Sequence, residues 1–146
     1  MHIPPPPVTQ ALSSETFRPP PLDGSITLCE MYDWHARNTS NHRLFVFAQE
    51  DGTTRTIFWP EAVKAVWTGA RLIRDRVSSR PLEKTPLEKT PIVAILSMSD
   101  TISYFITMMS IIRANFIVFP ISPRNSPQAV AHLISKVGVD HILMVS

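Results

Sequence analysis

The residues that could carry chemistry in this chain are few and lie far apart. Its four glycines stand at positions 24, 52, 69 and 138, and no two are close in sequence. Phosphate-binding loops need clustered glycines, because their backbone N–H groups must approach the phosphate oxygens closely. The sequence therefore contains neither a P-loop nor a dinucleotide-binding fingerprint.

The histidines and the single cysteine do not have the spacing of a metal site. The histidines are at positions 2, 35, 42, 132 and 141, and no metal-ligand spacing joins them. His132 is interpreted as a packed or half-exposed residue of an apolar helix, and Cys29 as a small buried hydrophobe on a helix. One cysteine forms no internal disulfide, so nothing demands an oxidising compartment.

Two polar clusters follow predicted parallel strands, which is where α/β proteins bind ligands. Asp100 follows the first strand and could act as a general base. Ser122, Arg124 and Ser126 follow the second, where Arg124 could reach an anion with the two serines as donors.

Both clusters also fit the start of a helix, and this interpretation is favoured. Asp100 or Ser99 is suited to cap the helix that follows. Asn125 or Ser126 can cap the next helix, with Pro127 in its first turn. We therefore assign no catalytic, cofactor-binding or metal-binding residue to this chain.

Composition indicates a globular chain with little charge excess. Hydrophobic residues make up 44% and charged residues 18%, and the formal net charge is +2. So small an excess gives no broad positive field, and the arginines at 71, 74, 76 and 80 are interpreted as a solvated helix flank. No nucleic-acid partner is expected.

The apolar stretch 101–121 is the one segment that could suggest a membrane protein. Its sequence is TISYFITMMSIIRANFIVFPI, and Arg113, Asn115 and Pro120 interrupt its second half. A buried helix followed by a buried strand is favoured over a membrane span, which remains a third possibility. With no secretory signal at the N-terminus, we expect a cytoplasmic protein without a membrane partner.

The first half of the chain divides into a leader, a helix, a hairpin and a long helix. Residues 1–24 hold seven of the fourteen prolines and are expected to form an extended leader. A helix is predicted over Leu28–Asn38, with Ser25 or Thr27 as its cap. Strands over Leu44–Ala48 and Thr54–Trp59 are predicted to form a hairpin around an Asp-Gly turn.

The long helix is predicted over Glu61–Val77, with Pro60 at its first position. Its apolar positions, which repeat at helical spacing, are Val63, Val66, Trp67, Ala70, Ile73 and Val77. Lys64, Arg71, Arg74 and Asp75 are expected to face water. The segment 78–91, which contains PLEKT twice, is predicted to be an exposed loop because its prolines exclude a helix.

The last third alternates between strands and helices. Strands are predicted over Ile92–Leu96, Phe116–Phe119 and His141–Val145, and helices end near Arg113 and Lys136. Strands that are apolar on both faces belong in a parallel sheet covered by helices. The fold class predicted is α/β, with an incomplete Rossmann-like parallel sheet and flanking helices.

Three blocks of sequence resemble the adenylate-forming superfamily of acyl-CoA synthetases and nonribosomal peptide synthetase adenylation domains. The segment IFWPEAVKAVWTGARLI is similar to the early motif in which a strand leads into a helix that starts Tyr-x-Glu-Leu. The segment from Pro91 to Ile134 resembles the next block, with Arg113-Ala114-Asn115 in place of Lys-Ala-Gly. VGVDHILMVS resembles the strand that follows, and FPISPRNSPQAVAHL is closest to fungal synthetase-reductase-type members.

The resemblance implies that residues 25–146 are the N-terminal portion of an adenylation domain. Members activate a carboxylic acid with ATP and Mg²⁺ to an acyl-adenylate and pass it to a carrier or CoA thiol. The family's phosphate loop and catalytic lysine come later than the matching blocks, so no family site residue is carried over to this chain. Asn115 where members have Gly, and Ser122 where many have Asp, depart from the pattern.

Two functional hypotheses follow from the sequence. The first is a truncated adenylation domain that is inactive alone, with an open sheet edge and marginal stability. The alternative is a stand-alone small α/β module that binds a partner through its sheet edge or its Pro-rich leader.

Overall fold

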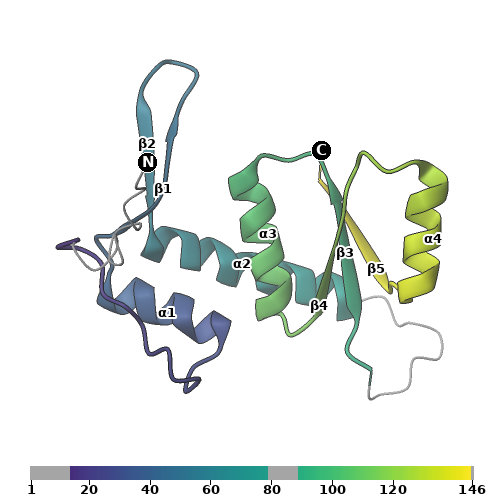
Figure 1. Ribbon diagram of the computed structural model, residues 1–146, viewed down its shortest axis with the longest axis horizontal. Helices are drawn as coiled ribbons and strands as arrows, with labels where there is room; N and C mark the ends of the chain where they lie inside the picture. Colours follow the sequence, from purple (N-terminus) through teal and green to yellow (C-terminus); the bar gives the residue numbers. More distant parts are fainter. Residues whose placement is uncertain (1–13, 79–88, 146) are drawn as a thin grey trace, which may run out of the picture. The chain divides into compact units, whose positions relative to one another are not determined.

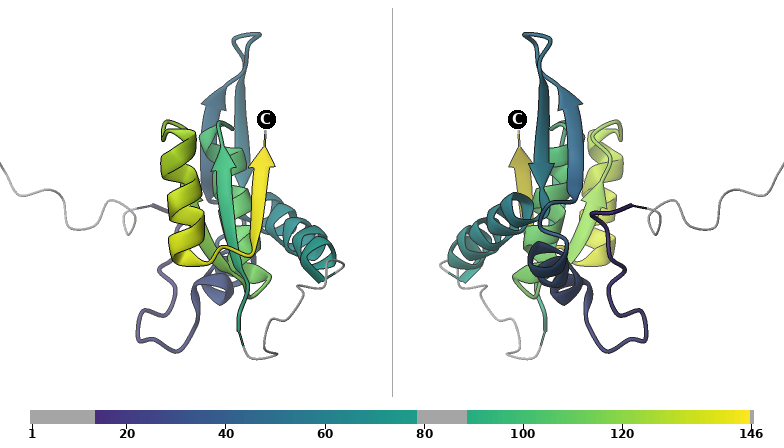
Figure 2. Two further views of the ribbon diagram at one scale, coloured as in Figure 1. Left: turned by 90° about the vertical axis from the view of Figure 1, so that its right-hand side faces the viewer. Right: turned by 90° about the vertical axis from the view of Figure 1, so that its left-hand side faces the viewer.

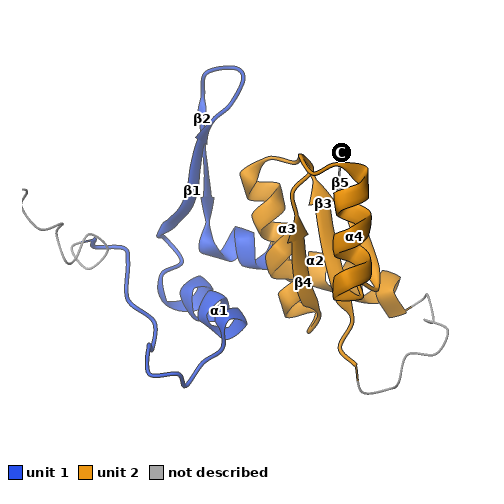
Figure 3. Ribbon diagram, turned by 45° about the vertical axis from the view of Figure 1, so that its right-hand side comes forward, with its two compact units in different colours: residues 1–64 blue, residues 65–146 orange. Residues whose placement is uncertain are grey.

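The computed structural model describes residues 14–78 and 89–145, so most of the predicted leader and most of the PLEKT loop lie outside the described residues. The chain divides into two compact units, residues 1–64 and 65–146 (Figure 3). The predicted boundary after residue 24 stays a prediction. Residues 14–27 contain neither helix nor strand.

The first unit begins with helix α1, Leu28–Asn38, whose bounds match the prediction. Thr27 is its cap. The Thr27 backbone N–H donates to the Glu30 carboxylate at 2.7 Å, and the Glu30 N–H donates to Thr27 Oγ1 at 3.3 Å. This reciprocal capping box satisfies N–H groups that the first turn of a helix leaves free.

The predicted hairpin is present as strands β1, Arg43–Ala48, and β2, Thr54–Phe58, paired antiparallel. At its turn, Gly52 has a φ of 79°, and Asp51 Oδ1 accepts a hydrogen bond from the Thr53 N–H at 2.9 Å. A glycine suits this position because side chains disfavour positive φ.

Helix α2 spans Trp59–Ser78, so the prediction that Trp59 ends the strand is wrong. Pro60 explains the difference. Its missing N–H is harmless in the first turn of a helix, and its fixed φ is helical already, so the helix begins one residue before it. The Trp59 side chain is buried rather than continuing the alternation of β2.

The second unit contains a parallel sheet of order β4-β3-β5 (Figure 1). Its strands are β3, Ile92–Ser97, β4, Ile117–Ile121, and β5, His141–Val145. Helices α3, Thr101–Arg113, and α4, Pro127–Val137, connect them and lie on opposite faces of the sheet (Figure 2). The predicted α/β fold with a parallel sheet and flanking helices is confirmed.

The core of this unit lies between β3 and the two helices α2 and α3. It consists of residues from these three elements and the C-cap residue of α3, namely Ala70, Ile73, Val77, Val93, Ile95, Ile111 and Ala114. In the central strand, Val93, Ala94 and Ile95 are fully buried, because side chains of both faces are covered. This explains why β3 reads as an uninterrupted apolar run.

Two predictions in this unit need correction. Trp67 was expected in the core, but it is 51% exposed, and the Arg113 guanidinium lies 4.2 Å from the centre of its ring. The indole therefore lies at the edge of the core, with one face in a cation–π contact and much of its surface in water. Strand β4 also extends through Pro120, because an edge strand tolerates a missing N–H.

Candidate functional site

The sheet topology brings the two predicted polar clusters to one edge. Strands β3 and β4 are parallel neighbours, so the segments after Ser97 and after Ile121 both leave the carboxyl edge of the sheet. From β3 the chain moves to β4 on one side, and then crosses to β5 on the other side. The carboxyl end of β3 is therefore the topological switch point, the usual ligand position in open α/β sheets.

Asp100 lies at this switch point as the cap of α3. Its Oδ1 accepts hydrogen bonds from the N–H groups of Ile102, at 2.9 Å, and Ser103, at 3.0 Å. Hydrogen bonds from Ser103, followed by the one from Ile102, lower the pKa of Asp100 below its ordinary value. A carboxylate held in its ionised form by a helix terminus is a weak proton acceptor, so the interpretation as a cap is confirmed.

The serines beside Asp100 bond to each other. Ser97 Oγ donates to Ser99 Oγ at 2.9 Å and accepts the Ser99 N–H at 3.0 Å. Met98, between them, is 85% exposed. These contacts build a tight turn after β3, and they engage both hydroxyls in the turn itself.

The second cluster also forms the start of a helix. Ser126 Oγ accepts the Ala129 N–H at 3.2 Å, and Pro127 stands in the first turn of α4. Ser122 Oγ accepts the Arg124 N–H at 3.3 Å, and Arg124 itself is exposed. Of the two predicted caps, Ser126 is the one used.

The remaining residues that the sequence offered as candidates lie on separate helices and form no common site. His132 is exposed on α4 rather than packed, and Cys29 is half-buried on α1 rather than buried. Arg71, Arg74 and Arg76 are exposed on α2, as a solvated flank requires. Within residues 14–78 and 89–145, no group of three or more His, Cys, Asp or Glu side chains could hold a metal ion, and no helix is long and apolar enough to span a membrane.

Sequence reasoning missed an aromatic cluster around His35 in the first unit. The His35 ring stacks on Trp59 with 4.3 Å between ring centres and 15° between planes. Its Nδ1 lies 2.9 Å from Thr39 Oγ1, and Phe17 contacts both His35 and His42. Burial, and secondly the charge of His42, lower the pKa of His35.

This cluster joins the segment before α1 to the start of α2. The Tyr32 ring also contacts Trp59, edge to face with 5.3 Å between ring centres. The sequence signal for this cluster was the spacing of Tyr32 and His35, which places both rings on one side of α1. A neutral imidazole buried among aromatic rings serves packing, and no reacting group lies beside it among the contacts of the described residues.

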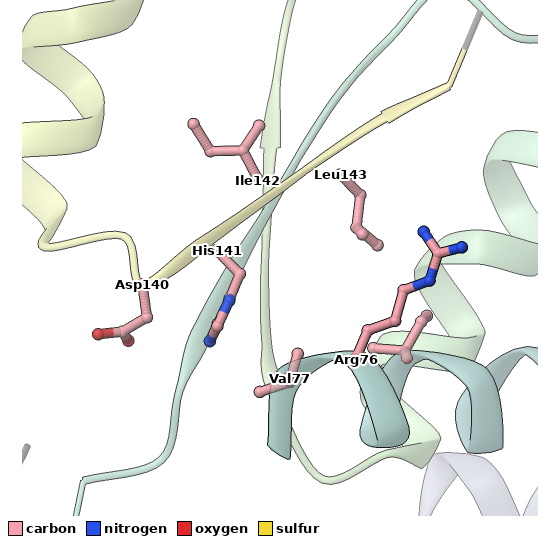
Figure 4. Close-up of a pocket in the computed structure, with 7 residues that line it drawn as sticks. Arg76, Val77, Asp140, His141, Ile142 and Leu143 are labelled. Atoms are coloured by element: carbon pink, nitrogen blue, oxygen red, sulfur yellow. The ribbon is translucent and has the colours of Figure 1, made fainter. Parts of the chain in front are cut away.

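Two hollows lie along β5 in the second unit. The larger, about 620 Å³, is lined by Ile73, Arg76 and Val77 of α2 and by residues 140–143. In Figure 4 the His141 ring extends toward α2, whereas Asp140 turns away from it and accepts the Ile92 N–H at 2.8 Å. The smaller hollow, about 300 Å³, is lined mainly by apolar residues of α2, α3 and β5.

Comparison with known proteins gives clear relatives in sequence. No protein-family model matches the chain. It is 46% identical over 143 residues to the adenylate-forming reductase Nps10 of Heterobasidion annosum, a match that covers 97% of this chain and 13% of that protein. It is 35% identical over 133 residues to Nps11 of Serpula lacrymans var. lacrymans (strain S7.9), covering 89% of this chain and 11% of the relative.

Comparison with solved structures shows the fold. The N-terminal subdomain of Klebsiella oxytoca NpsA, in complex with 3-hydroxybenzoyl-AMSN, matches with a TM-score of 0.64 and 15% identity, over 80% of this chain and 26% of that one. A fatty acid AMP ligase from Legionella pneumophila matches with a TM-score of 0.62 and 13% identity, over 82% and 20%. The resemblance to the adenylate-forming superfamily and its fungal reductases is confirmed.

Proposed function

We propose that this chain forms part of the scaffold of an acid-activating domain. Its sequence matches fungal adenylate-forming reductases, and its fold matches subdomains of adenylation domains. It spans 13% of the length of Nps10 and 11% of the length of Nps11. The observation that carries the proposal is the 46% identity to Nps10 over 97% of the chain.

The reaction of the complete domain would be the activation of a carboxylic acid with ATP to an acyl-adenylate, followed by transfer to a thiol. One solved structure of similar fold is an artificially fused adenylation–PCP di-domain from Klebsiella oxytoca, which supports a carrier domain as the acceptor. We place this activity, and therefore this chain, in the cytoplasm.

The residues described here do not fit a site for ATP and Mg²⁺. Gly69 lies inside α2, Gly52 lies in the turn between β1 and β2, and Gly138 ends α4. At the switch point, the side chains of Ser97, Ser99 and Asp100 form hydrogen bonds within the turn and the start of α3. No cluster of acidic side chains among the described residues could hold the metal. We therefore derive no catalytic step from this chain and assign it the positioning of the sheet around which such a site is built.

A chimaera of Nps10 tests the proposal. The 46%-identical segment of Nps10 is exchanged for this chain, and acid-dependent release of pyrophosphate from ATP is measured over a panel of aromatic and aliphatic acids. The chimaera is expected to release pyrophosphate, whereas this chain by itself releases none. A chimaera that folds but never forms an adenylate would contradict the proposal.

The alternative function, a stand-alone binding module, depends on the sheet edge or on the Pro-rich leader. Residues 1–13 of the leader lie outside the described residues, and in its described part Phe17 packs against His35 and His42 of the same unit. Among the described residues, β5 pairs with β3 alone, so its outer edge is open.

A further inference from the structure

We propose that Thr16 and Phe17 form an acid-sensitive latch, which holds the segment before α1 against His35 and His42 and releases it when the two imidazoles gain protons. The four residues lie within the first compact unit, residues 1–64. The latch controls whether residues 14–27 lie on this unit or extend into solvent. The inference is independent of the proposed function, because it concerns a movement and no chemical step.

The segment before α1 is joined to the unit by few polar contacts. Residues 14–27 contain neither helix nor strand, and the three prolines at positions 19–21 have no N–H group to donate. Among the described residues, the contact between Thr16 Oγ1 and His42 Nδ1, at 2.9 Å, is the one hydrogen bond that joins residues 14–26 to the rest of the chain. The segment can therefore leave the unit without breaking a helix or a strand.

Phe17 anchors the segment by contacting two histidine rings at once. Its ring centre is 5.5 Å from that of His35 and 5.1 Å from that of His42, and the second contact is edge to face. Phe17 is half-buried, whereas its neighbours Thr16 and Arg18 are exposed. An aromatic ring that packs on two others gains from buried area and from ring geometry, so Phe17 is the main attachment of the segment.

The hydrogen bonds of His35 determine where an added proton goes. Thr39 Oγ1 donates to the His35 carbonyl at 3.1 Å, so toward the ring it acts as the acceptor of the proton on His35 Nδ1, at 2.9 Å. A second proton therefore binds at Nε2, which makes no hydrogen bond within the described residues. Because His35 is 4% exposed and stacks on Trp59, the added charge is shielded from solvent and has no acceptor.

His42 places a second positive charge close to the first. Burial, and secondly the charge of His42, lower the pKa of His35, so two charged rings repel each other across this cluster. Tyr32, on the other side of Trp59, stays neutral because burial raises its pKa. In the described part of the chain, the charged side chains that flank the cluster form no hydrogen bond or ion pair with either imidazole; they are Glu15, Arg18, Asp33, Arg37, Arg43 and Glu61.

Release of Phe17 exposes His35 and raises its pKa toward the ordinary value. A group whose pKa is lower in the docked state binds its proton more tightly in the released state, so acid favours release. Docking keeps its full strength above pH 6.5, the ordinary value for His35, and weakens as the pH falls below it. The ratio of docked to released chain is expected to fall with a limiting slope of about tenfold per pH unit for each proton taken up.

The distance between two spin labels measures the docking directly. Labels on Glu15→Cys and Asn41→Cys, in a Cys29→Ser background, are next in sequence to the two residues of the Thr16–His42 hydrogen bond, and both positions are exposed. The labelled chain is diluted with unlabelled chain, so that the distances measured lie within one molecule. Pulsed dipolar EPR is expected to give one narrow distance distribution at pH 7.5 and a broader, longer one at pH 5.0, while circular dichroism shows that the helices remain.

Three variants assign the effect to the latch. The double variant His35→Phe with His42→Phe keeps both rings but cannot gain protons, so its distance distribution is expected to be the same at both pH values. Phe17→Ala removes the anchor and is expected to give the broad distribution already at pH 7.5. Leu22→Ala is the matched control: this side chain lies in the same segment, is 78% exposed, and its loss is expected to leave the behaviour of the wild type unchanged.

Four results would each overturn the proposal. A wild-type distribution that stays narrow at pH 5.0 would show that attraction between an imidazolium and the Phe17 ring exceeds the cost of charging the cluster. Release at pH 5.0 that persists in the double histidine variant would assign it to other groups. A narrow distribution in Phe17→Ala would show that Phe17 is not the anchor. Loss of the helical signal together with docking would show unfolding of the whole unit in place of a latch.

Discussion

At the scale of single residues, a departure from the family pattern has a conformational explanation. Asn115 stands where the superfamily sequence has glycine, and it has a φ of 64°, the only positive value among the non-glycine residues described. Asparagine is the side chain that tolerates this left-handed conformation best. The turn between α3 and β4 therefore keeps its geometry without glycine.

Asn115→Val is expected to destabilise the fold by about 1–2 kcal/mol, because a β-branched side chain is strained at positive φ. Asn115→Gly is the matched control and is expected to change the free energy of unfolding by only a few tenths of a kcal/mol. Urea unfolding followed by circular dichroism measures both. Equal stability of the two variants would show that the left-handed conformation is not required.

The lowered pKa of His35 predicts that the stability of the fold depends on pH. Burial lowers its pKa from the ordinary value of 6.5, so the folded state binds its proton less tightly than the unfolded chain does. The neutral His35 ring therefore contributes its full share of the folding stability above pH 6.5. That share decreases as the pH falls below 6.5 toward the lowered pKa. The melting temperature is expected to fall between pH 7 and pH 5.

His35→Gln is the control for this pH effect, because it removes the titrating ring. The variant is less stable at pH 7, since it loses the stacking on Trp59, but its melting temperature changes less between pH 7 and pH 5. His42→Gln is also measured, because His42 is the charged neighbour that acts on His35. A wild-type slope that His35→Gln preserves would assign the pH dependence to other groups.

At the scale of elements, local sequence rules predicted most helices and strands. The capping residues Thr27, Asp100 and Ser126 act within their own first turns, so their roles could be read from spacing. The two polar clusters were recognised for the same reason. The stacking of His35 on Trp59 and the hollows along β5 depend on tertiary packing, which periodicity does not encode.

The crossing of α2 and α3 depends on a glycine that the sequence did not single out. A Cβ atom at Gly69 would lie 2.9 Å from Ser110 Cβ and would also collide with Ser110 Oγ. Ser110 is fully buried, and its hydroxyl donates to the Ile106 carbonyl at 2.7 Å, so it has little room to move. The two helices approach closely because Gly69 has no side chain.

Gly69→Ala is therefore expected to destabilise the protein by about 1–3 kcal/mol, although alanine is the better helix former. The double variant Gly69→Ala with Ser110→Gly removes both atoms that the new Cβ would meet. It is expected to be more stable than the sum of the two single changes predicts, which a double-mutant cycle of thermal unfolding measures. Strict additivity would show that the two residues do not touch.

At the scale of the whole molecule, one sheet has a buried centre and an unprotected side. Val93 and Ile95 of β3 are fully buried, whereas Met144 and Ile142 of β5 are exposed. The open edge was predicted from the hypothesis of a truncated adenylation domain, whose parallel sheet would lack later strands. Which of the two edges is open to extension required the strand order.

The isolated chain is expected to self-associate with rising concentration, because β5 exposes both backbone donors and apolar side chains. Met144→Lys should reduce this association by placing a charge at the edge, whereas Leu22→Lys should not. Light scattering during size-exclusion chromatography measures the mass. A monomer at all concentrations that unfolds in one sharp transition would contradict this expectation.

The measurement that tests the central claim most directly is acid-dependent pyrophosphate release by the Nps10 chimaera. A chain that supplies scaffold to an acid-activating domain should keep the rate within about tenfold of Nps10, a difference of about 1.4 kcal/mol in the barrier. The same chain alone should give no acid-dependent release. A folded chimaera without activity, or acid-dependent release by the isolated chain, would contradict the account.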